Sequence, residues 1–576
     1  MANNCFSTPY KPESSTGLYL AQVLSHAEKH PEKLACVFQP RGPETAETLS
    51  YGELNKQVVT RAKLLVESGL SGQHVGLLFP TGIEFVVDFL ACLAAGAYAV
   101  PMNLTKNAKQ LERTLTILRD TGVKTILTTQ ETQVLLHAEL RDIQALSGFR
   151  WLDERHAATQ NRTLPSIQLD DTAFIQYTSG STSAPKGVIV THRNIIDNQL
   201  AIQKACDHQP GLIAGGWLPQ FHDMGLIGHM LQPLFLGGTY VFMPPLNFIQ
   251  RPLRWLQLID QYRIHSSAAP NFGYEHCMKM IRDDKQIQQL DLSCWKVALN
   301  GSEPVKASTM HTFAERFACA GFEHGSFFPC YGMAETTLFV SGGPKSTGIR
   351  SLKLNRNALA QGKITTADNE PDALPLTIVN CGELSPHFAC AIVDPITGSR
   401  CQDSTVGEIW LKGRSVAKGY LNQPDISQEV FAAKIAGEHD GQYLRTGDLG
   451  FVHGGCLFVT GRHKELMIVR GKNIYPYDLE QICNSYEHAT GGNGASVFTV
   501  SDGDKTAIAA VVEIKKRSLR DQCHDVMNQD LKHALSSEAG ITLDHLLLVP
   551  PGSLPKTTSG KVRRGECHRL LNLDQA

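Results

Sequence analysis

The chain of 576 residues has almost no net charge, no long apolar run and no closely spaced cysteine pair. Its 54 basic and 56 acidic residues give a net charge of −2, so the electrostatics make no case for a nucleic-acid partner. The most apolar stretch, Phe85 to Val100, carries Asp88 and is shorter than the roughly 20 residues of a membrane span, so no integral membrane segment is expected.

The 15 cysteines form no Cys-x-x-Cys pair and no metal-ligand spacing, which favours free thiols in a reducing cytosol. The first residues show no basic region followed by an apolar core, so no signal peptide is expected. Together these absences predict a cytoplasmic protein.

Strand-like and helix-like segments alternate in the first half of the chain, which predicts an α/β fold. Apolar residues recur at helical spacing from Phe85 to Leu93, whereas residues 74–79, 123–127 and 296–299 are typical of strands. From about residue 376 short strands and turns predict a small β subdomain. We therefore expect a large N-terminal domain, 1–461, made of α/β subdomains and this β part, and a smaller mobile α+β C-terminal domain, 462–576.

One loop, between the predicted strands 174–177 and 188–190, concentrates hydroxyl groups, glycines and a lysine. Such a loop offers backbone N–H groups, hydroxyl donors and a cation to one small volume, which suits a polyphosphate. It differs from the usual phosphate loop because Ala184-Pro185-Lys186 stands where Gly-Lys-Ser/Thr would be required. The alternative is a Ser/Thr-rich surface turn.

Four further segments carry residues suited to catalysis. They are Leu218 to Gly225 with a histidine, Pro329 to Thr337 with a tyrosine and a carboxylate, Tyr443 to Gly450 with an acid on a tight turn, and Leu554 to Arg564 with a lysine in a Gly/Ser loop. Each has a plain structural interpretation when taken alone. The lone histidine can be structural, the carboxylate can favour a helix start, and the lysine can be a solvated surface charge.

Taken together and in this order, the five segments resemble the adenylate-forming superfamily of acyl and aryl ligases, luciferases and peptide-synthetase adenylation domains. Residues 174–187, 221–225 and 461–480 are most similar to the fatty acyl-AMP ligases. The resemblance extends from about Leu18 to Arg564. It implies ATP and Mg²⁺ as cofactors and a reaction in two steps, in which a carboxylate attacks the α-phosphorus of ATP and a thiol then displaces AMP from the acyl-adenylate.

The resemblance also implies roles for individual residues. Lys561 would bridge the acyl carboxylate and the α-phosphate, His222 would lie near the reacting groups, and Lys464 would be the hinge of the tail domain. Glu335 would bind Mg²⁺ with Thr178. ATP would be held by the loop residues Thr178, Ser179, Gly180, Ser181, Thr182 and Lys186, by Gly301, Ser302, Glu303 and Pro304 beside adenine, by Tyr331, Gly332 and Met333 on its other side, and by Asp448 and Arg462 at the ribose.

The acid-binding pocket is expected behind residues 221–230 and 268–274, where apolar and small residues alternate. An open channel there would favour an alkyl chain by about 0.8 kcal/mol per buried CH₂, which predicts a medium- or long-chain fatty acid. Simple core packing is the alternative, and Asp223 leaves room for an amino or aryl acid. The candidate pocket residues are Phe221, Gly225, Ile227, Met230, Asn271 and Phe272.

The acceptor depends on an irregular segment, residues 341–374. In the fatty acyl-AMP ligases an insertion in this region is linked to failure to use coenzyme A, and the resemblance therefore implies transfer to the phosphopantetheine of an acyl carrier protein acting in trans. The alternatives are a passive surface insertion, a fatty acyl-CoA synthetase, or a non-catalytic nucleotide-binding protein. A monomer is expected.

Overall fold

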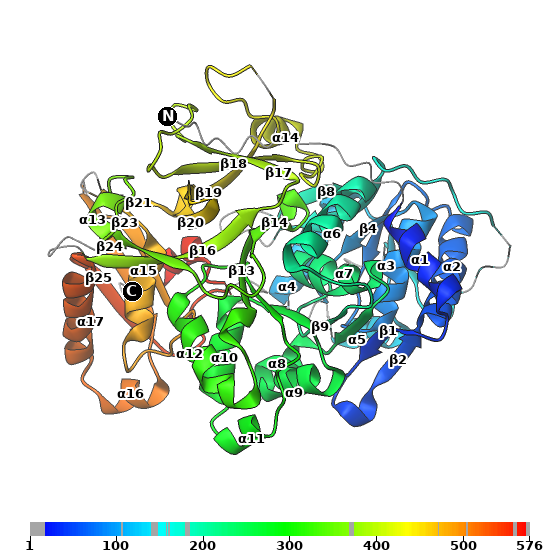
Figure 1. The fold of residues 1–576 in the computed structure, drawn as a ribbon, viewed down its shortest axis with the longest axis horizontal. Coiled ribbons are helices and arrows are strands. Elements are labelled where there is room, and N and C mark those ends of the chain that lie inside the picture. The colour runs from blue at the N-terminus through cyan, green and yellow to red at the C-terminus, as the bar shows by residue number, and fades with distance from the viewer. Residues whose placement is uncertain are drawn as a thin grey trace.

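The computed structural model describes residues 18–104, 108–139, 148–156, 158, 160, 162–178, 185–367, 374–439, 441–469, 472–502, 505–556 and 561–571. Within these ranges the α/β prediction is confirmed. The N-terminal helices and the C-terminal sheet lie at opposite ends of the longest axis (Figure 1).

A six-stranded sheet forms the first layer. Its order is β6 (Arg150–Leu152), β5 (Thr125–Leu127), β3 (His74–Leu77), β4 (Tyr98–Pro101), β7 (Thr172–Tyr177) and β8 (Gly187–Thr191), parallel except for β8. The predicted apolar helix is α3 (Ile83–Ala95), and its residues from Phe85 to Ala95 are all buried. The other helices of this half are α1 (Tyr19–Lys29), α2 (Tyr51–Glu67), α4 (Ala108–Thr121), α5 (Gln130–Glu139) and α6 (His192–Cys206).

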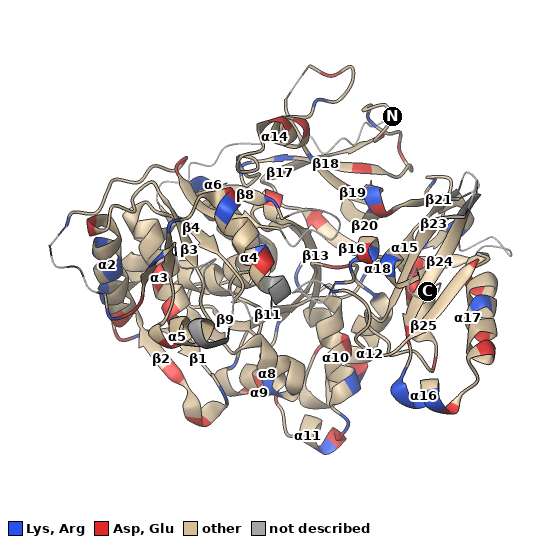
Figure 2. Ribbon diagram, turned by 180° about the vertical axis from the view of Figure 1, so that it is seen from behind, with Lys and Arg blue, Asp and Glu red and all other residues tan. Residues whose placement is uncertain are grey.

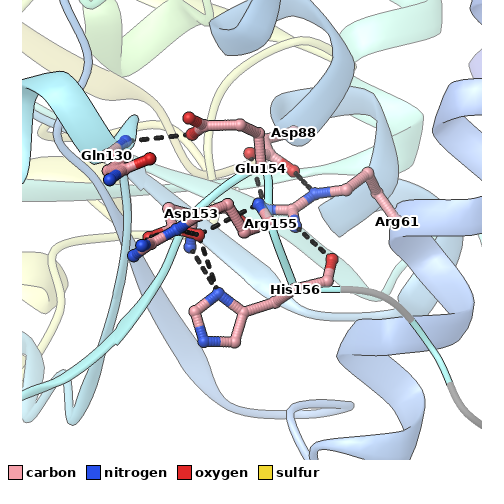
Figure 3. Close-up of polar contacts among 7 residues, drawn as sticks. All are labelled: Arg61, Asp88, Gln130, Asp153, Glu154, Arg155 and His156. Carbon is pink, nitrogen blue, oxygen red and sulfur yellow. Dashed lines mark hydrogen bonds and ion pairs between the residues drawn. The ribbon is translucent and has the colours of Figure 1, made fainter.

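A buried polar network explains why α3 carries Asp88 (Figure 3). Arg61 of α2 donates two hydrogen bonds to the Asp88 carboxylate, at 2.6 and 2.9 Å, and a third to the Asp153 carbonyl at 2.9 Å. The Asp153 carboxylate is fully buried and accepts hydrogen bonds from Arg155 and His156, and the Arg155 guanidinium holds the pKa of Asp153 at about 2. The network pairs each buried charge, as burial requires, and fastens residues 153–156 to the helices.

The second sheet has 14 strands and combines a parallel centre with an antiparallel extension. β11 (Ser266–Ala269), β12 (Val297–Asn300) and β13 (Phe327–Gly332) run parallel at its centre. On one side follow β9 (Ile213–Gly216), β10 (Thr239–Phe242), β1 (Leu34–Phe38) and β2 (Glu47–Ser50). On the other side follow β14 (Phe339–Gly342), β16 (Pro375–Leu384), β20 (Cys456–Arg462), β19 (Leu444–His453), β18 (Gly407–Gly413) and β17 (Phe388–Val393), with β15 (Ser351–Asn355) paired to β16.

Thus the short strands predicted after residue 376 continue the central sheet through β14 instead of forming a sheet of their own. Helices surround this sheet: α7 (Gln232–Phe235), α8 (Pro245–Gln250), α9 (Leu253–Tyr262), α10 (Asn271–Met280), α11 (Asp284–Gln288), α12 (Ala307–Phe317), α13 (Arg356–Leu359) and α14 (Pro424–Phe431), together with a π-helix, η3 (Met224–Leu231).

The remaining residues form a small α+β unit. A three-stranded sheet, β23 (Ala495–Asp502), β24 (Lys505–Glu513) and β25 (His545–Val549), shares an apolar core with α15 (Pro476–Ser485) and α17 (His524–Ala539). The unit also contains β21 (Met467–Val469), β22 (Lys472–Ile474), α16 (Lys516–Asp521) and α18 (Arg564–Leu571). The division between 461 and 462 stays a prediction.

Candidate functional site

A cavity of about 620 Å³ lies where the carboxyl ends of β11, β12 and β13 meet β19, β20 and the C-terminal unit. Loops that follow parallel strands converge at one edge of a sheet, which is where α/β folds place their sites. The cavity is lined by the predicted residues Thr178, Lys186, Phe221, His222, Gly301, Ser302, Glu303, Pro304, Tyr331, Gly332, Met333, Glu335, Asp448, Arg462, Lys464 and Lys561.

Tyr331, Asp448 and Arg462 form one hydrogen-bonded group. Asp448 and Arg462 are directly paired across β19 and β20, and the guanidinium Nε lies 2.9 Å from one carboxylate oxygen of Asp448. The other oxygen accepts a hydrogen bond of 2.7 Å from the Tyr331 hydroxyl. Both oxygens of the Asp448 carboxylate are therefore engaged, which fixes its orientation beside a guanidinium that is half exposed.

Glu335 and Lys186 both contact the side chain of Tyr420. The Tyr420 hydroxyl donates a 2.8 Å hydrogen bond to the Glu335 carboxylate, and the ammonium of Lys186 lies 4.6 Å from the centre of the Tyr420 ring. Burial raises the pKa of Glu335, and burial together with Lys464 lowers the pKa of Lys186. A buried carboxylate of this kind fits Mg²⁺, which proteins hold through one or two carboxylates plus substrate phosphates.

Tyr420 was missed by the sequence argument. It stands in a short segment that forms an isolated bridge with Val188 of β8, far from both Glu335 and Lys186 in the chain. The only sequence signal was an aromatic residue following Gly419 and Lys418, which does not distinguish this position from an ordinary turn.

Lys561 reaches the cavity from the C-terminal unit and faces acids of the N-terminal part. Burial and the neighbouring Arg462 lower its pKa, while Glu303, Asp223 and Asp448 act in the opposite direction. Glu303, Asp223 and Asp448 therefore act electrostatically on a lysine that the C-terminal unit contributes to the cavity.

His222 is held by the residue that follows it. Its Nδ1 lies 2.7 Å from the Asp223 carboxylate, which also accepts the backbone N–H of Met224 at 2.6 Å. Burial raises the pKa of Asp223, but His222, the Met224 N–H and Lys561 outweigh it and lower that pKa overall. Because this carboxylate is already engaged, the structure gives no support for Asp223 as the partner of an amino-acid ammonium group.

The loop after β12 connects the two parts of the protein. The Glu303 carboxylate accepts the Phe272 N–H at 2.6 Å and the Asn493 side-chain amide at 3.2 Å, and the Tyr477 hydroxyl donates to the Pro304 carbonyl at 3.0 Å. Ser302 has a φ of 69°, a backbone conformation that costs a non-glycine residue energy and often marks a functional site.

The Ser/Thr-rich loop is only partly described. Ser179, Gly180, Ser181 and Thr182 lie outside the described residues. At its two ends the Thr178 N–H donates to the Lys186 carbonyl at 3.0 Å, and β7 and β8 pair antiparallel as predicted. Arg113 of α4, which the sequence argument did not consider, lines the same cavity and donates to the Thr178 carbonyl at 3.1 Å.

Lys464 lies on a single 3₁₀ turn, His463–Glu465, directly after β20. It lines the cavity, and its ammonium contributes to lowering the pKa of Lys186. Its role as the hinge between the two parts stays a prediction.

Five of the six candidate acyl-pocket residues do not line the cavity. Ile227 and Met230 are fully buried in the core, and a Cβ at Gly225 would lie 2.1 Å from the Pro219 carbonyl oxygen. Asn271 bonds to Glu275 and Thr309 at 2.9 and 3.2 Å, and the Phe272 ring packs on Trp217 at 5.8 Å between centroids. Of the six, Phe221 alone contributes to the wall among the described residues.

The cavity instead passes other residues of the same region. η3 is a π-helix, whose hydrogen bonds join residues five apart, and it presents Met224, Gly228 and His229 to the cavity. The residues of this part that line the cavity are Met224, Gly228, His229, Ala268, Leu299 and Leu338, followed by Ile202, His208 and Ser266.

The predicted insertion packs against the C-terminal unit. Leu354 and Leu359 are buried in one core with Tyr475. The Asn473 N–H donates to the Ala360 carbonyl at 2.9 Å, and the Arg356 guanidinium lies 3.8 Å from the Asp478 carboxylate. The described part of the insertion is therefore in contact with the unit that carries Lys561.

Comparison with known proteins gives concordant results. The family model described as AMP-binding enzyme matches residues 23–421. The medium-chain fatty acid–[acyl-carrier-protein] ligase TtuA of Teredinibacter turnerae is 35% identical over 96% of this chain and 92% of its own. The long-chain fatty acid–AMP ligase FadD28 of Mycobacterium tuberculosis is 34% identical over 92% of this chain and 93% of its own.

A solved structure agrees as well. The fatty acyl-adenylate ligase from L. pneumophila, in complex with acyl adenylate and pyrophosphate, superposes with a TM-score of 0.74 at 34% identity, and the match covers 96% of each chain. In the described part of this chain, no helix is long and apolar enough to cross a membrane.

Proposed function

Because the chain belongs to the AMP-binding enzyme family, we propose that it is a fatty acyl-AMP ligase that activates a medium- or long-chain fatty acid with Mg-ATP and passes the acyl group to an acyl carrier protein. One observation carries the proposal. A single cavity joins Lys561, His222 and Glu335 to a mostly apolar channel past Gly228, Ala268 and Leu338.

The first step brings a carboxylate to a polyphosphate. Two like charges about 4 Å apart repel by about 4 kcal/mol at an effective dielectric near 20. We assign Lys561 to the oxygens that approach each other, since cations placed where charge develops lower the barrier. His222, oriented by Asp223 at 2.7 Å, would donate to the same region.

The nucleotide would be held on both sides of the reacting phosphate. Tyr331, with Gly332 and Met333, would stack on adenine against the Gly301 to Pro304 loop, and Asp448 with Arg462 would bind the ribose hydroxyls. Thr178 and Lys186 would hold the outer phosphates. Glu335, with Thr178, would hold Mg²⁺, which when bound neutralises phosphate oxygens.

The test is a screen of acids by pyrophosphate release with Mg-ATP. We expect saturated fatty acids to give acyl-AMP and amino acids to give little, because the Asp223 carboxylate that could pair with an ammonium group is engaged by His222. A preference for an amino acid over every fatty acid would refute the lipid assignment. If no acid of any class gives pyrophosphate release, the enzyme assignment is refuted.

The contacts of the insertion support transfer to a carrier protein instead of to coenzyme A. The second step requires the C-terminal unit to rotate, as the family resemblance implies, and the contact of Arg356 with Asp478 opposes that rotation. Arg563 and Arg564 are not available to an acidic carrier, because they pair with Glu566 and Glu480. Figure 2 marks the basic residues of α16, and we assign these cations to the carrier: Arg517 and Arg520 share Asp521 as an ion-pair partner, but their side chains are 89% and 77% exposed.

We expect the intact protein to acylate a carrier protein far faster than coenzyme A. Arg356→Ala should raise coenzyme A acylation about three- to fivefold, the scale of one weak ion pair, and leave acyl-AMP formation unchanged. Arg350→Ala is the matched control, because the Arg350 guanidinium donates to the Gly343 carbonyl within the same segment. Thioester assays with both acceptors decide the matter, and efficient acyl-CoA formation by the intact protein would refute this part.

The monomeric state and cytoplasmic location stay predictions.

A further inference from the structure

One part of the cavity wall, here called the polar floor, carries two buried polar side chains that the proposed reaction does not use. His208, which lies between α6 and β9, and Ser266, the first residue of β11, both line it there, together with Ile202. The two polar side chains belong to residues that are only 4% and 3% exposed. The methylene and methyl groups of an unsubstituted alkyl chain could not form hydrogen bonds with these side chains.

The direction of β11 places this floor away from the reaction centre. The carboxyl end of β11 leads through Pro270 to Phe272, whose N–H binds Glu303 beside Lys561. Ser266 is three residues before that end, which corresponds to about 10 Å along a strand. His229, between the two ends, is already satisfied because its Nε2 accepts the Ala268 N–H at 2.8 Å.

His208 differs from His229 in having no partner. Neither of its ring nitrogens has a hydrogen bond within the described part of the chain. Burial, followed by His265 and Lys345, lowers the pKa of His208 to about 3, so the ring is neutral near pH 7. A neutral imidazole offers one N–H donor and one nitrogen acceptor, and a buried polar group left without a partner is costly.

We propose that the preferred fatty acid carries a neutral polar group, a hydroxyl or a carbonyl, at or near its distal end, and that His208 with Ser266 hydrogen-bonds this group. The inference rests on the proposed function and names its substrate class. His208 is thereby a specificity residue that contacts the end of the chain opposite the reacting carboxylate.

The charges around the floor favour a neutral group over a carboxylate. Lys345 is the cation that acts electrostatically on His208, and its ammonium already pairs with Asp207 at 3.4 Å. Since the imidazole is neutral, a distal carboxylate would be buried without a free counter-charge, which is strongly unfavourable.

The experiment compares acyl-AMP formation from saturated fatty acids of increasing length, each paired with its ω-hydroxy and ω-carboxy counterparts. For the length that reaches the floor, we expect kcat/KM for the ω-hydroxy acid to exceed that for the unsubstituted acid by about tenfold or more. His208→Leu should lower this ratio by about tenfold or more, while the kcat/KM of the plain acid holds or rises.

His265→Leu is the matched control, because His265 neighbours Ser266 but does not line the cavity. It should leave the ratio unchanged. His208→Leu should also raise the Tm of the free protein, since it removes an unpaired buried polar group, and His208→Asn should recover part of the ω-hydroxy preference.

An unsubstituted acid preferred at every length, or a ratio that His208→Leu does not change, would overturn the inference and leave the fatty acyl-AMP ligase assignment standing. A preference for the ω-carboxy acid would also overturn it. If no fatty acid of any kind forms acyl-AMP, the proposed function fails and the inference fails with it.

Discussion

Lys561→Ala is expected to reduce acyl-AMP formation by on the order of 10³-fold or more, because it removes a cation placed where charge develops. Lys561 lines the cavity, where burial and Arg462 lower its pKa and the carboxylates of Glu303, Asp223 and Asp448 oppose that lowering. Acyl transfer from a supplied acyl-AMP to a carrier protein should continue at close to the normal rate, since that step needs no new bond to the α-phosphate.

The measurement is single-turnover acyl-AMP formation, followed by carrier acylation from synthetic acyl-AMP. Lys556→Ala is the control from the same segment, because the Lys556 ammonium lies 3.4 Å from Glu513 within the C-terminal unit. It should leave acyl-AMP formation unaffected. A normal rate in Lys561→Ala, or equal losses in both half-reactions, would contradict the assignment.

Glu335→Gln is expected to lower acyl-AMP formation by about 10²-fold and to raise the Mg²⁺ concentration needed for half-maximal rate. The substitution keeps the shape of the side chain and its contact with the Tyr420 hydroxyl, at 2.8 Å, but removes the charge. Loss of the carboxylate leaves Lys186 as the charged group beside Tyr420. A positively charged lysine cannot hold Mg²⁺.

The measurement is a Mg²⁺ titration of pyrophosphate release at saturating ATP and fatty acid. Glu429→Gln is the matched control, because Glu429 also lines the cavity but its side chain is 70% exposed. An unchanged Mg²⁺ requirement in Glu335→Gln would contradict the role of this carboxylate, whatever the change in rate.

The segments that the sequence predicted well are those with a strong local pattern. The apolar run beginning at Phe85 forms a buried helix, and the strands on both sides of the Ser/Thr-rich loop pair as expected. The reason is that hydrophobic periodicity and turn residues act over a few neighbouring positions. The order of the motifs along the chain was likewise enough to indicate the family.

Residues that depend on distant partners could not be found in this way. Tyr420 contacts Glu335 and Lys186, which are far from it in sequence. The cavity wall depends on the π-helical turn of η3, which places Gly228 and His229 on it, whereas Ile227 and Met230 of the predicted pocket lie in the core.

The sequence by itself determined the α/β class, the adenylate-forming family and many of the residues that line the cavity, because short motifs carry these and each motif is local. Only the tertiary structure decided the course of the cavity past η3, the unpartnered imidazole of His208 on its wall and the contact of Arg356 with Asp478. These features arise where separate strands, helices and the C-terminal unit meet, and no local pattern in the chain specifies which side chains a packed interface leaves without partners.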